Sequence, residues 1–291
     1  MPMIPFAYHR PTSLAEASAL GEQFGSCAAF LAGGTELLPD YQRGRETAAH
    51  LIALDEIHEL RGISVDGDTL RIGALTTVAE LASSPLVASW LRALAEAARS
   101  IGSPQIRSRA TVGGNFCRAV SCADLPPAAI AGRARLRLSS RTGERVIDAH
   151  EFFVSSRHTV LAHGELLVEL LVPAREVASG TSFQRFAHRR GMAVAVASVA
   201  AGVTLDDDRI GAATIALGAV APVPIVVDEA RSLLVGERPS ASLFRRAATA
   251  CADAAQPISD IRGSADFRRA LVGVLAGRAL EQATARARER T

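Results

Sequence analysis

Two pairs of adjacent glycines, at residues 33–34 and 113–114, constrain the fold of this chain more than any other feature. The first pair ends a short apolar run, residues 28–32, which is typical of a buried strand that enters a tight loop. Adjacent glycines let the backbone turn sharply, and they let its N–H groups approach a bound anion without obstruction by side chains. A diphosphate is the natural ligand for a pair of such loops.

Short polar side chains stand beside both glycine pairs. Thr35 follows the first pair, and Thr111 and Asn115 flank the second, so all three can hydrogen-bond to a ligand there. Asp124 follows the second loop and can accept a hydrogen bond from a sugar hydroxyl. Neither loop has the glycine spacing of the dinucleotide-binding fingerprint or the Gly-Lys-Ser ending of a P-loop. The alternative interpretation of each pair by itself is a turn that ends a strand.

The length and the charge of the chain limit the classes of protein to which it can belong. The chain has 291 residues, of which 48% are hydrophobic, so it can form two domains with a sizeable buried core. Its 32 basic and 30 acidic residues nearly cancel. Charge therefore gives no argument for binding nucleic acid or an anionic membrane surface.

Other features of the composition predict a cytoplasmic location. The longest apolar region, Met192 to Val203, is shorter than the roughly 20 residues that a membrane span needs. The first ten residues lack the basic and apolar segments of a secretory signal. The four cysteines are scattered and form no secreted disulfide framework.

Helical and strand patterns mix along the chain without the regular alternation of a doubly wound parallel sheet, which favours the α+β class. Capping patterns at Ser13 and Thr77 predict helix starts, and apolar spacing predicts one helix each over residues 13–24 and 85–99. The charged tail from Arg286 is expected to fray. The other predicted elements are strands over residues 51–54 and 165–172, hairpins around 66–67 and 142–143, three strands between 182 and 220, and helices from 228 onward.

Clusters of cysteine, histidine and arginine give weaker signals. Cys117 and Cys122 supply two thiols, whereas zinc and iron–sulfur sites normally need four protein ligands, so no metal site is expected. The histidines of the second half share no metal-ligand spacing. The cluster of Arg185, Arg189 and Arg190 has apolar flanks, which favours a position near a cofactor or a subunit contact over nucleic-acid binding.

The glycine loops and several other segments resemble the medium, FAD-binding subunit of the xanthine dehydrogenase and carbon monoxide dehydrogenase family, the molybdenum hydroxylases. The resemblance covers nearly the whole chain in the expected order, and the second loop with its downstream Asp124 is the most specific element. The similar segments are AGGTELL (32–38), IGSPQIR (101–107), TVGGN (111–115) with DLPP (124–127), LGAVAPVP (217–224) and DIRGSADFRR (260–269).

The resemblance implies a fold of two domains. Residues 1–175 would form a two-part FAD-binding domain of the p-cresol methylhydroxylase type, with subdomains of about 1–57 and 58–175. Residues 176–291 would form a C-terminal domain of the carbon monoxide dehydrogenase flavoprotein type, in which an antiparallel sheet packs on a helical bundle. The break in the sequence pattern that begins at Pro173 agrees with this division.

The resemblance also implies roles for individual residues. The two loops would hold the diphosphate and the adenosine side of FAD through Leu31, Ala32, Gly33, Gly34, Thr35, Glu36, Leu37, Leu38, Thr111, Val112, Gly113, Gly114 and Asn115. Asp124 would bind a sugar hydroxyl, and Ile101, Leu167 and Arg185 would lie near the flavin. Arg185 stands where the family usually has lysine, which keeps the charge but changes its geometry. Ala193 stands where the family often has an acidic residue, in a loop that lies near the flavin ring.

The implied function is electron transfer. Electrons would pass from [2Fe-2S] clusters of a small partner subunit through FAD in this chain to an external acceptor, which could be NAD, oxygen, a quinone or a carrier protein. A large subunit with the molybdenum cofactor would oxidise the organic substrate, and a dimer of heterotrimers is expected. No catalytic residue is assigned to this chain.

Two alternatives stay open on the residues. A self-sufficient FAD oxidase or dehydrogenase of the same fold usually needs a catalytic His, Tyr or Arg over the flavin, and the only tyrosines, Tyr8 and Tyr41, are N-terminal. A scaffold subunit that has lost flavin is the other alternative. The intact glycine pairs, Asn115 and Asp124 argue against it.

Overall fold

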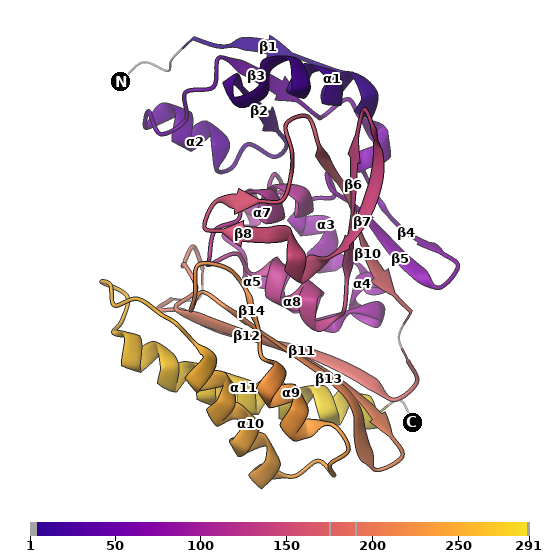
Figure 1. The fold of residues 1–291 in the computed structure, drawn as a ribbon, viewed down its shortest axis with the longest axis vertical. Coiled ribbons are helices and arrows are strands. Elements are labelled where there is room, and N and C mark those ends of the chain that lie inside the picture. Colours follow the sequence, from indigo (N-terminus) through magenta and orange to yellow (C-terminus); the bar gives the residue numbers. More distant parts are fainter. Residues whose placement is uncertain (1–4, 175, 190, 290–291) are drawn as a thin grey trace.

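The structure, a computed structural model, describes residues 5–174, 176–189 and 191–289. Three blocks of strands and helices follow each other along the long axis in the order of the sequence (Figure 1). The α+β class predicted from the sequence is confirmed. Among the described helices, none is long and apolar enough to cross a membrane.

The first block is a three-stranded parallel sheet in the order β1-β3-β2 with two helices between its strands. Its elements are β1 (Ala7–His9), α1 (Leu14–Phe24), β2 (Ala28–Leu31), α2 (Leu37–Gln42) and β3 (His50–Ala53). Ser13 caps α1 as predicted, because its hydroxyl accepts a hydrogen bond from the backbone N–H of Glu16 at 3.2 Å. The regular alternation of strand and helix in this block was not predicted. Its strands are three or four residues long, which is too short for a periodic pattern.

The second block is built around a five-stranded antiparallel sheet in the order β4-β5-β10-β6-β7, whose apolar core includes side chains from the accompanying helices. Both predicted hairpins belong to this sheet. The strands are β4 (Ile63–Asp66), β5 (Thr69–Gly73), β6 (Arg135–Ser140), β7 (Gly143–Asp148) and β10 (Leu166–Pro173), and a separate small pair is β8 (Phe153–Ser155) with β9 (His158–Thr159).

Six short helices accompany this sheet. They are α3 (Val78–Ser83), α4 (Pro85–Trp90), α5 (Arg92–Ser100), α6 (Pro104–Arg107), α7 (Val112–Cys117) and α8 (Leu125–Ala131). The capping box of Thr77 with Glu80 is confirmed at the start of α3. The single helix predicted over residues 85–99 is wrong, because Leu91 leaves the helical region with φ −142° and ψ 79° and divides the segment into α4 and α5.

The third block is a four-stranded antiparallel sheet in the order β11-β12-β13-β14 with helices on one face. Its elements are β11 (Ser179–Phe186), β12 (Ala197–Asp206), β13 (Arg209–Gly218), β14 (Ile225–Val226), α9 (Asp228–Leu234), α10 (Ala241–Ala254) and α11 (Ala265–Arg288). The three long strands and the C-terminal helices agree with the sequence. The predicted division at 175–176 lies between β10 and β11, and residue 175 itself is outside the described residues.

The third sheet lies between α10 and α11 on one face and α5 and α8 of the second block on the other (Figure 1). The approach is close on both faces. A Cβ atom on Gly202 would lie 2.2 Å from the carbonyl oxygen of Ala131 in α8, and one on Gly180 would lie 2.0 Å from that of Ala283 in α11. The second and third blocks therefore pack backbone against backbone.

In the described part of the charged tail, α11 continues to Arg288, whereas the sequence predicted fraying from Arg286. The guanidinium of Arg286 is 11% exposed, and its Nη1 atom lies 3.2 Å from Oε2 of Glu96 in α5. It also donates to the carbonyl oxygen of Thr181 in β11. This ion pair ties the end of α11 to the second block, and residues 290–291 lie outside the described range.

Candidate functional site

A cavity of about 280 Å³ lies where the two glycine loops meet. The first loop connects β2 of the first block to α2, and the second leads into α7 of the second block, so the cavity lies between the two blocks. Many of the predicted site residues line it together: Ala32, Gly33, Gly34, Thr35, Glu36, Leu37, Ile101, Thr111, Gly114 and Asn115. The structure thus brings together residues that are about 80 positions apart in the chain.

The first loop offers unpaired backbone donors to this cavity. Within the described ranges, the N–H groups of residues 33–37 have no hydrogen-bond acceptor. Gly34 has φ +73°, a left-handed conformation that favours glycine. The chain becomes helical only after this point, where the N–H of Leu38 donates to the carbonyl oxygen of Gly34 at 3.2 Å. Five consecutive donors of this kind form a binding surface for an anion.

The second loop uses its backbone differently. Each of the first four N–H groups already donates within the chain: Val112 to Thr76 O (3.0 Å), Gly113 to Ala74 O (2.7 Å), Gly114 to Thr111 Oγ1 (3.1 Å) and Asn115 to Thr111 O (3.0 Å). The expectation that these N–H groups face an anion is therefore wrong. The second loop contributes to the cavity through its side chains, and the side-chain Oδ1 atom of Asn115 is buried without a hydrogen-bond partner.

The four glycines of the loops are needed for different reasons. A Cβ atom on Gly33 would lie 1.9 Å from the carbonyl oxygen of Arg109, and one on Gly113 would lie 2.8 Å from Cβ of Ala74. These two glycines therefore permit close packing of neighbouring segments. A Cβ atom on Gly114 would meet only Oγ1 of Thr111, at 2.9 Å, and this glycine lines the cavity. Unpaired backbone donors and an open backbone position suit a ligand that carries a diphosphate, and the unpartnered Oδ1 atom of Asn115 can accept a hydrogen bond from an N–H or hydroxyl group of the same ligand.

Asp124 lies in a buried polar network behind the second loop. Its Oδ2 atom accepts a hydrogen bond from the hydroxyl of Ser100 at 3.0 Å and lies 3.3 Å from Nε of Arg185. Burial raises the pKa of Asp124 to about 6, although the Arg185 charge and the Ser100 hydroxyl oppose this shift. The Oδ1 atom has no partner among the described residues, so it can accept a hydrogen bond from a ligand hydroxyl.

Arg185 is held by the protein on several sides. Besides Asp124, it donates to the carbonyl oxygens of Ser100, at 2.9 Å, and of Ala193. Ala193 thus helps to hold Arg185 through its backbone carbonyl, a contact that does not depend on its side chain. Arg185 connects β11 of the third block to the end of α5, and its side chain is 12% exposed.

Not all of the remaining predicted residues lie at the cavity. Ile101 lines the cavity, and the loop before β12 reaches the same segment because the N–H of Met192 donates to the carbonyl oxygen of Gly102 at 3.2 Å. Leu167 is buried in β10, paired with Leu138 in the sheet, and is not among the residues that line the cavity. Arg190, from the predicted basic cluster, lies outside the described residues.

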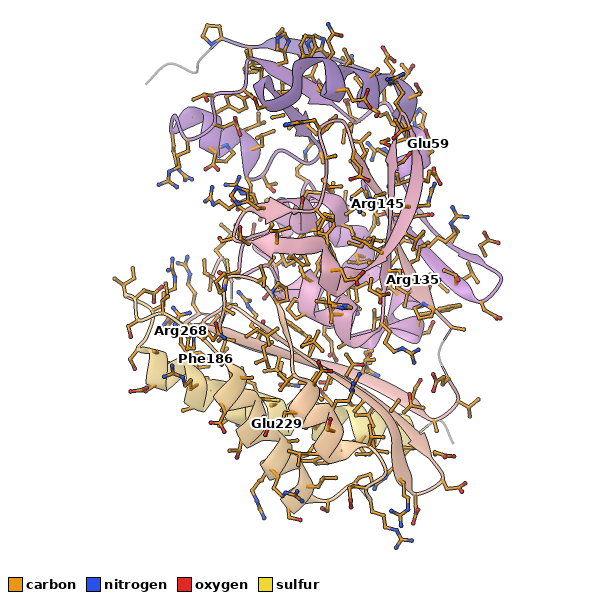
Figure 2. The ribbon with its side chains drawn as sticks, in the orientation of Figure 1. Glu59, Arg135, Arg145, Phe186, Glu229 and Arg268 are labelled. Carbon is orange, nitrogen blue, oxygen red and sulfur yellow. The ribbon has the colours of Figure 1, made fainter. Side chains whose placement is uncertain are left out.

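A second cavity, of about 450 Å³, lies between the segment after the second loop and the third block. Ser121 and Cys122 line it from one side, and Arg268 from the other. Arg268, shown in Figure 2 near the start of α11, is buried and lies 2.6 Å from Oδ1 of Asp260. The backbone N–H of Arg262 and the Arg268 guanidinium lower the pKa of Asp260 to about 2. Within the described part of the chain, no group of three or more His, Cys, Asp or Glu side chains could hold a metal ion.

The predicted site residues did not include six residues that line the first cavity: Phe30, Ile106, Ala110, Cys117, Arg118 and Val120. Cys117 and Arg118 are the polar ones among them. Both lie at the end of α7, and Arg118 follows Asn115 by three positions, which is one turn of a helix. That spacing would have placed Arg118 beside Asn115 if the short helix had been predicted.

Models of two protein families match most of the chain. The FAD binding domain in molybdopterin dehydrogenase matches residues 4–175, and the CO dehydrogenase flavoprotein C-terminal domain matches residues 182–283. Each domain is matched in the order that the resemblance implied. The chain therefore carries an FAD-binding domain.

Similar proteins of known identity cover the chain from end to end. The carbon monoxide dehydrogenase medium chain of Hydrogenophaga pseudoflava is 38% identical over 98% of this chain and 99% of its own. The medium chain from Afipia carboxidovorans is 33% identical over 98% of this chain and 100% of its own. In solved structures, a chain of the H. pseudoflava carbon monoxide dehydrogenase that lacks the Mo-pyranopterin moiety matches with a TM-score of 0.95 and 37% identity, over 98% of this chain and 99% of that chain. On this evidence the chain belongs to the FAD-binding, medium-chain family of the molybdopterin dehydrogenases, which are oxidoreductases.

Proposed function

We propose that this chain holds FAD between its two glycine loops and passes electrons from the [2Fe-2S] clusters of a partner subunit to an external acceptor. The observation that carries the proposal is the cavity with five unpaired backbone donors at residues 33–37. A diphosphate is the part of FAD that such donors bind, because it is anionic and has several acceptor oxygens. When bound, FAD supplies the redox chemistry, while the protein supplies position and electrostatics.

The residues of the site have separate roles in this proposal. Residues 31–38 bind the diphosphate, and residues 111–115 complete that side of the site through the side chains of Thr111 and Asn115. Asp124 binds a sugar hydroxyl through its free Oδ1 atom. Ile101, Leu167 and Arg185 lie beside the flavin, where the positive charge of Arg185 is balanced by Asp124 at 3.3 Å.

The proposal extends to the assembly and its domains. The names of the relatives, such as medium chain and complex subunit alpha, describe parts of larger enzymes. We assign this chain a large partner with the molybdenum cofactor and a small partner with two [2Fe-2S] clusters, arranged as a dimer of heterotrimers. Residues 1–175, with subdomains of about 1–57 and 58–175, form the FAD-binding domain, and residues 176–291 form the C-terminal domain.

Flavin content tests the first half of the proposal. The purified chain is expected to bind one FAD, and visible absorption of the protein fraction measures it. Denaturation is expected to release the flavin, because no covalent attachment is proposed. A chain that binds no FAD under these conditions is a scaffold, and the proposal fails.

Anaerobic reduction tests the second half. The chain with FAD is mixed with the organic substrate of the whole complex, with and without the two partner subunits. We expect the flavin absorption to bleach only when both partners are present, because this chain is proposed to relay electrons rather than to oxidise the substrate. Bleaching by the chain alone would establish a self-sufficient oxidase or dehydrogenase instead.

A further inference from the structure

We propose that Arg118 contacts the diphosphate of bound FAD and offsets part of its negative charge, a role that rests on the proposed FAD site. Among the described residues that line the first cavity, Arg118 is the one lysine or arginine, and Glu36 is the one acidic residue. Backbone donors orient a diphosphate, but they carry no net charge to offset its two negative charges. Arginine offsets one of them and can form two parallel hydrogen bonds to phosphate oxygens.

The side chain of Arg118 reaches from the second loop to the first. Arg118 ends α7, the helix that begins with the second loop. Its Nη2 atom pairs with Oδ2 of Asp40 in α2, and its Nε atom lies 3.6 Å from Oε2 of Glu36 in the first loop. The side chain is 20% exposed, and its contacts with Asp40 and Glu36 place the guanidinium beside the first loop and α2.

The charge balance leaves Arg118 available to a ligand. Asp40 is 7% exposed on its side chain and has a second cation, Arg157, whose Nη1 atom lies 3.7 Å from Oδ2. Glu36 is 67% exposed, so its contact with Arg118 is weak and its carboxylate can turn into water at small cost. The Nε atom of Arg118 is buried without a hydrogen-bond partner in the described chain. A phosphate oxygen at this position would satisfy it.

The second loop needs this side chain because the four backbone N–H groups that follow Thr111 are already used. The N–H groups of residues 112–115 all donate within the chain, so only side chains can serve a diphosphate from that side. Thr111 and Asn115 carry no charge. Arg118 therefore gives the second loop the strongest contact that it can make with the anion.

Three variants of the full chain test this assignment. Arg118→Met removes the charge, Arg118→Lys keeps a point charge, and Arg157→Met is the matched control, since Arg157 also pairs with Asp40 but does not line the cavity. FAD binding to the flavin-free chain is measured by titration, and ADP is measured as a competitor because it carries the diphosphate without the flavin. We expect Arg118→Met to weaken both ligands by the same factor, about 10- to 100-fold. Arg118→Lys is expected to lose less, and Arg157→Met less than about twofold.

Several outcomes would overturn the assignment. Equal losses in Arg118→Met and Arg157→Met would show that Arg118 acts only as a structural tie to Asp40. A loss for FAD without a matching loss for ADP would place Arg118 elsewhere on the cofactor. Should Arg118→Met not fold, Arg118→Lys decides: it keeps the charge that pairs with Asp40 but loses the two parallel hydrogen bonds, so FAD and ADP binding should weaken together, and unchanged binding contradicts the assignment. A wild-type chain that binds no FAD refutes the proposed function itself, whereas FAD binding that ignores Arg118 refutes only this inference.

Discussion

Both glycine loops contain an adjacent glycine pair with short polar neighbours, yet their backbones are used in opposite ways. The N–H groups of residues 33–37 have no acceptor within the described chain, whereas those of residues 112–115 all have one. In the first loop the backbone is left for a ligand. In the second it is used to join α7 to the segment after β5, and the side chains are left for the ligand. A glycine pair is therefore evidence of close packing as often as of anion binding.

The largest effect is expected at Gly33, where packing is tightest. Gly33→Ala should lower the free energy of unfolding by about 3 kcal/mol, because its Cβ would lie 1.9 Å from a backbone oxygen that cannot move aside independently. Urea denaturation of the flavin-free chain measures it. Gly277→Ala in α11, where no atom lies within 4 Å of the added Cβ, is the control and should stabilise by up to about 1 kcal/mol. A Gly33→Ala chain as stable as the wild type would show that the loops do not approach this closely.

On the side of the second loop, stability is expected to depend on pH in the range around pH 6, through Asp124. Its pKa of about 6 in the folded chain lies above the ordinary 3.8, so folding binds a proton there. The stabilising contribution of this carboxyl is full below about pH 4 and is lost as the pH rises through about 6, by roughly 3 kcal/mol in total.

Asp124→Asn removes this titration and tests its size. The difference in unfolding free energy between variant and wild type should change between pH 4 and 7 and then stay constant. If the difference in unfolding free energy between Asp124→Asn and the wild type does not change over this pH range, burial does not raise the pKa of Asp124.

A substitution at Gly114 distinguishes an effect on ligand binding from an effect on folding, because this residue lines the cavity and few atoms surround it. Gly114→Val should weaken FAD binding by about 100-fold, because its methyl groups would occupy space that the ligand needs. Its stability should fall by only about 1 kcal/mol, because the added Cβ would lie 2.9 Å from Oγ1 of Thr111 and would displace the hydroxyl that caps α7. Flavin absorption and urea denaturation give the two values. Gly114→Val with full flavin content would show that the second loop is only a turn.

The smallest effect is expected from the hydroxyl that caps α7. Thr111→Val removes the acceptor of the Gly114 N–H and should cost about 1 kcal/mol of stability. FAD affinity should fall by less than about tenfold. Ser240→Ala, which removes the cap of α10 far from the cavity, should cost a similar amount of stability and leave FAD binding unchanged. Unchanged FAD affinity in Thr111→Val would show that this hydroxyl caps the helix without contacting the ligand.

Features that depend on neighbouring residues were predictable from the sequence. The caps at Ser13 and Thr77 and the hairpin turns at 66–67 and 142–143 rest on contacts within a few positions, and all of them are present. The glycine pairs and Asn115 also predicted a ligand site at the two loops, and the loops line one cavity. Short-range patterns are sufficient when the interaction itself is short-range.

Features that depend on distant residues were not predictable. The N–H of Gly113 is bonded by Ala74, 39 positions earlier, so no local pattern could show that it is unavailable to a ligand. The segment of α7 contains two glycines, which have low helix propensity, and this concealed both the helix and Arg118 at its end. Arg286 was assigned to a frayed tail because its partner, Glu96, lies 190 positions away.

The ion pair of Glu96 with Arg286 has a consequence for how such chains can recombine. Two family models divide the chain near the connection between β10 and β11, which suggests a natural point of exchange between relatives. The partners of this pair stand on opposite sides of that point, and so do Gly202 and Ala131, whose backbones nearly touch. A hybrid gene joined there inherits each half of these contacts from a different parent. The C-terminal segment can therefore be exchanged only between parents that both have Glu96, Arg286 and Gly202.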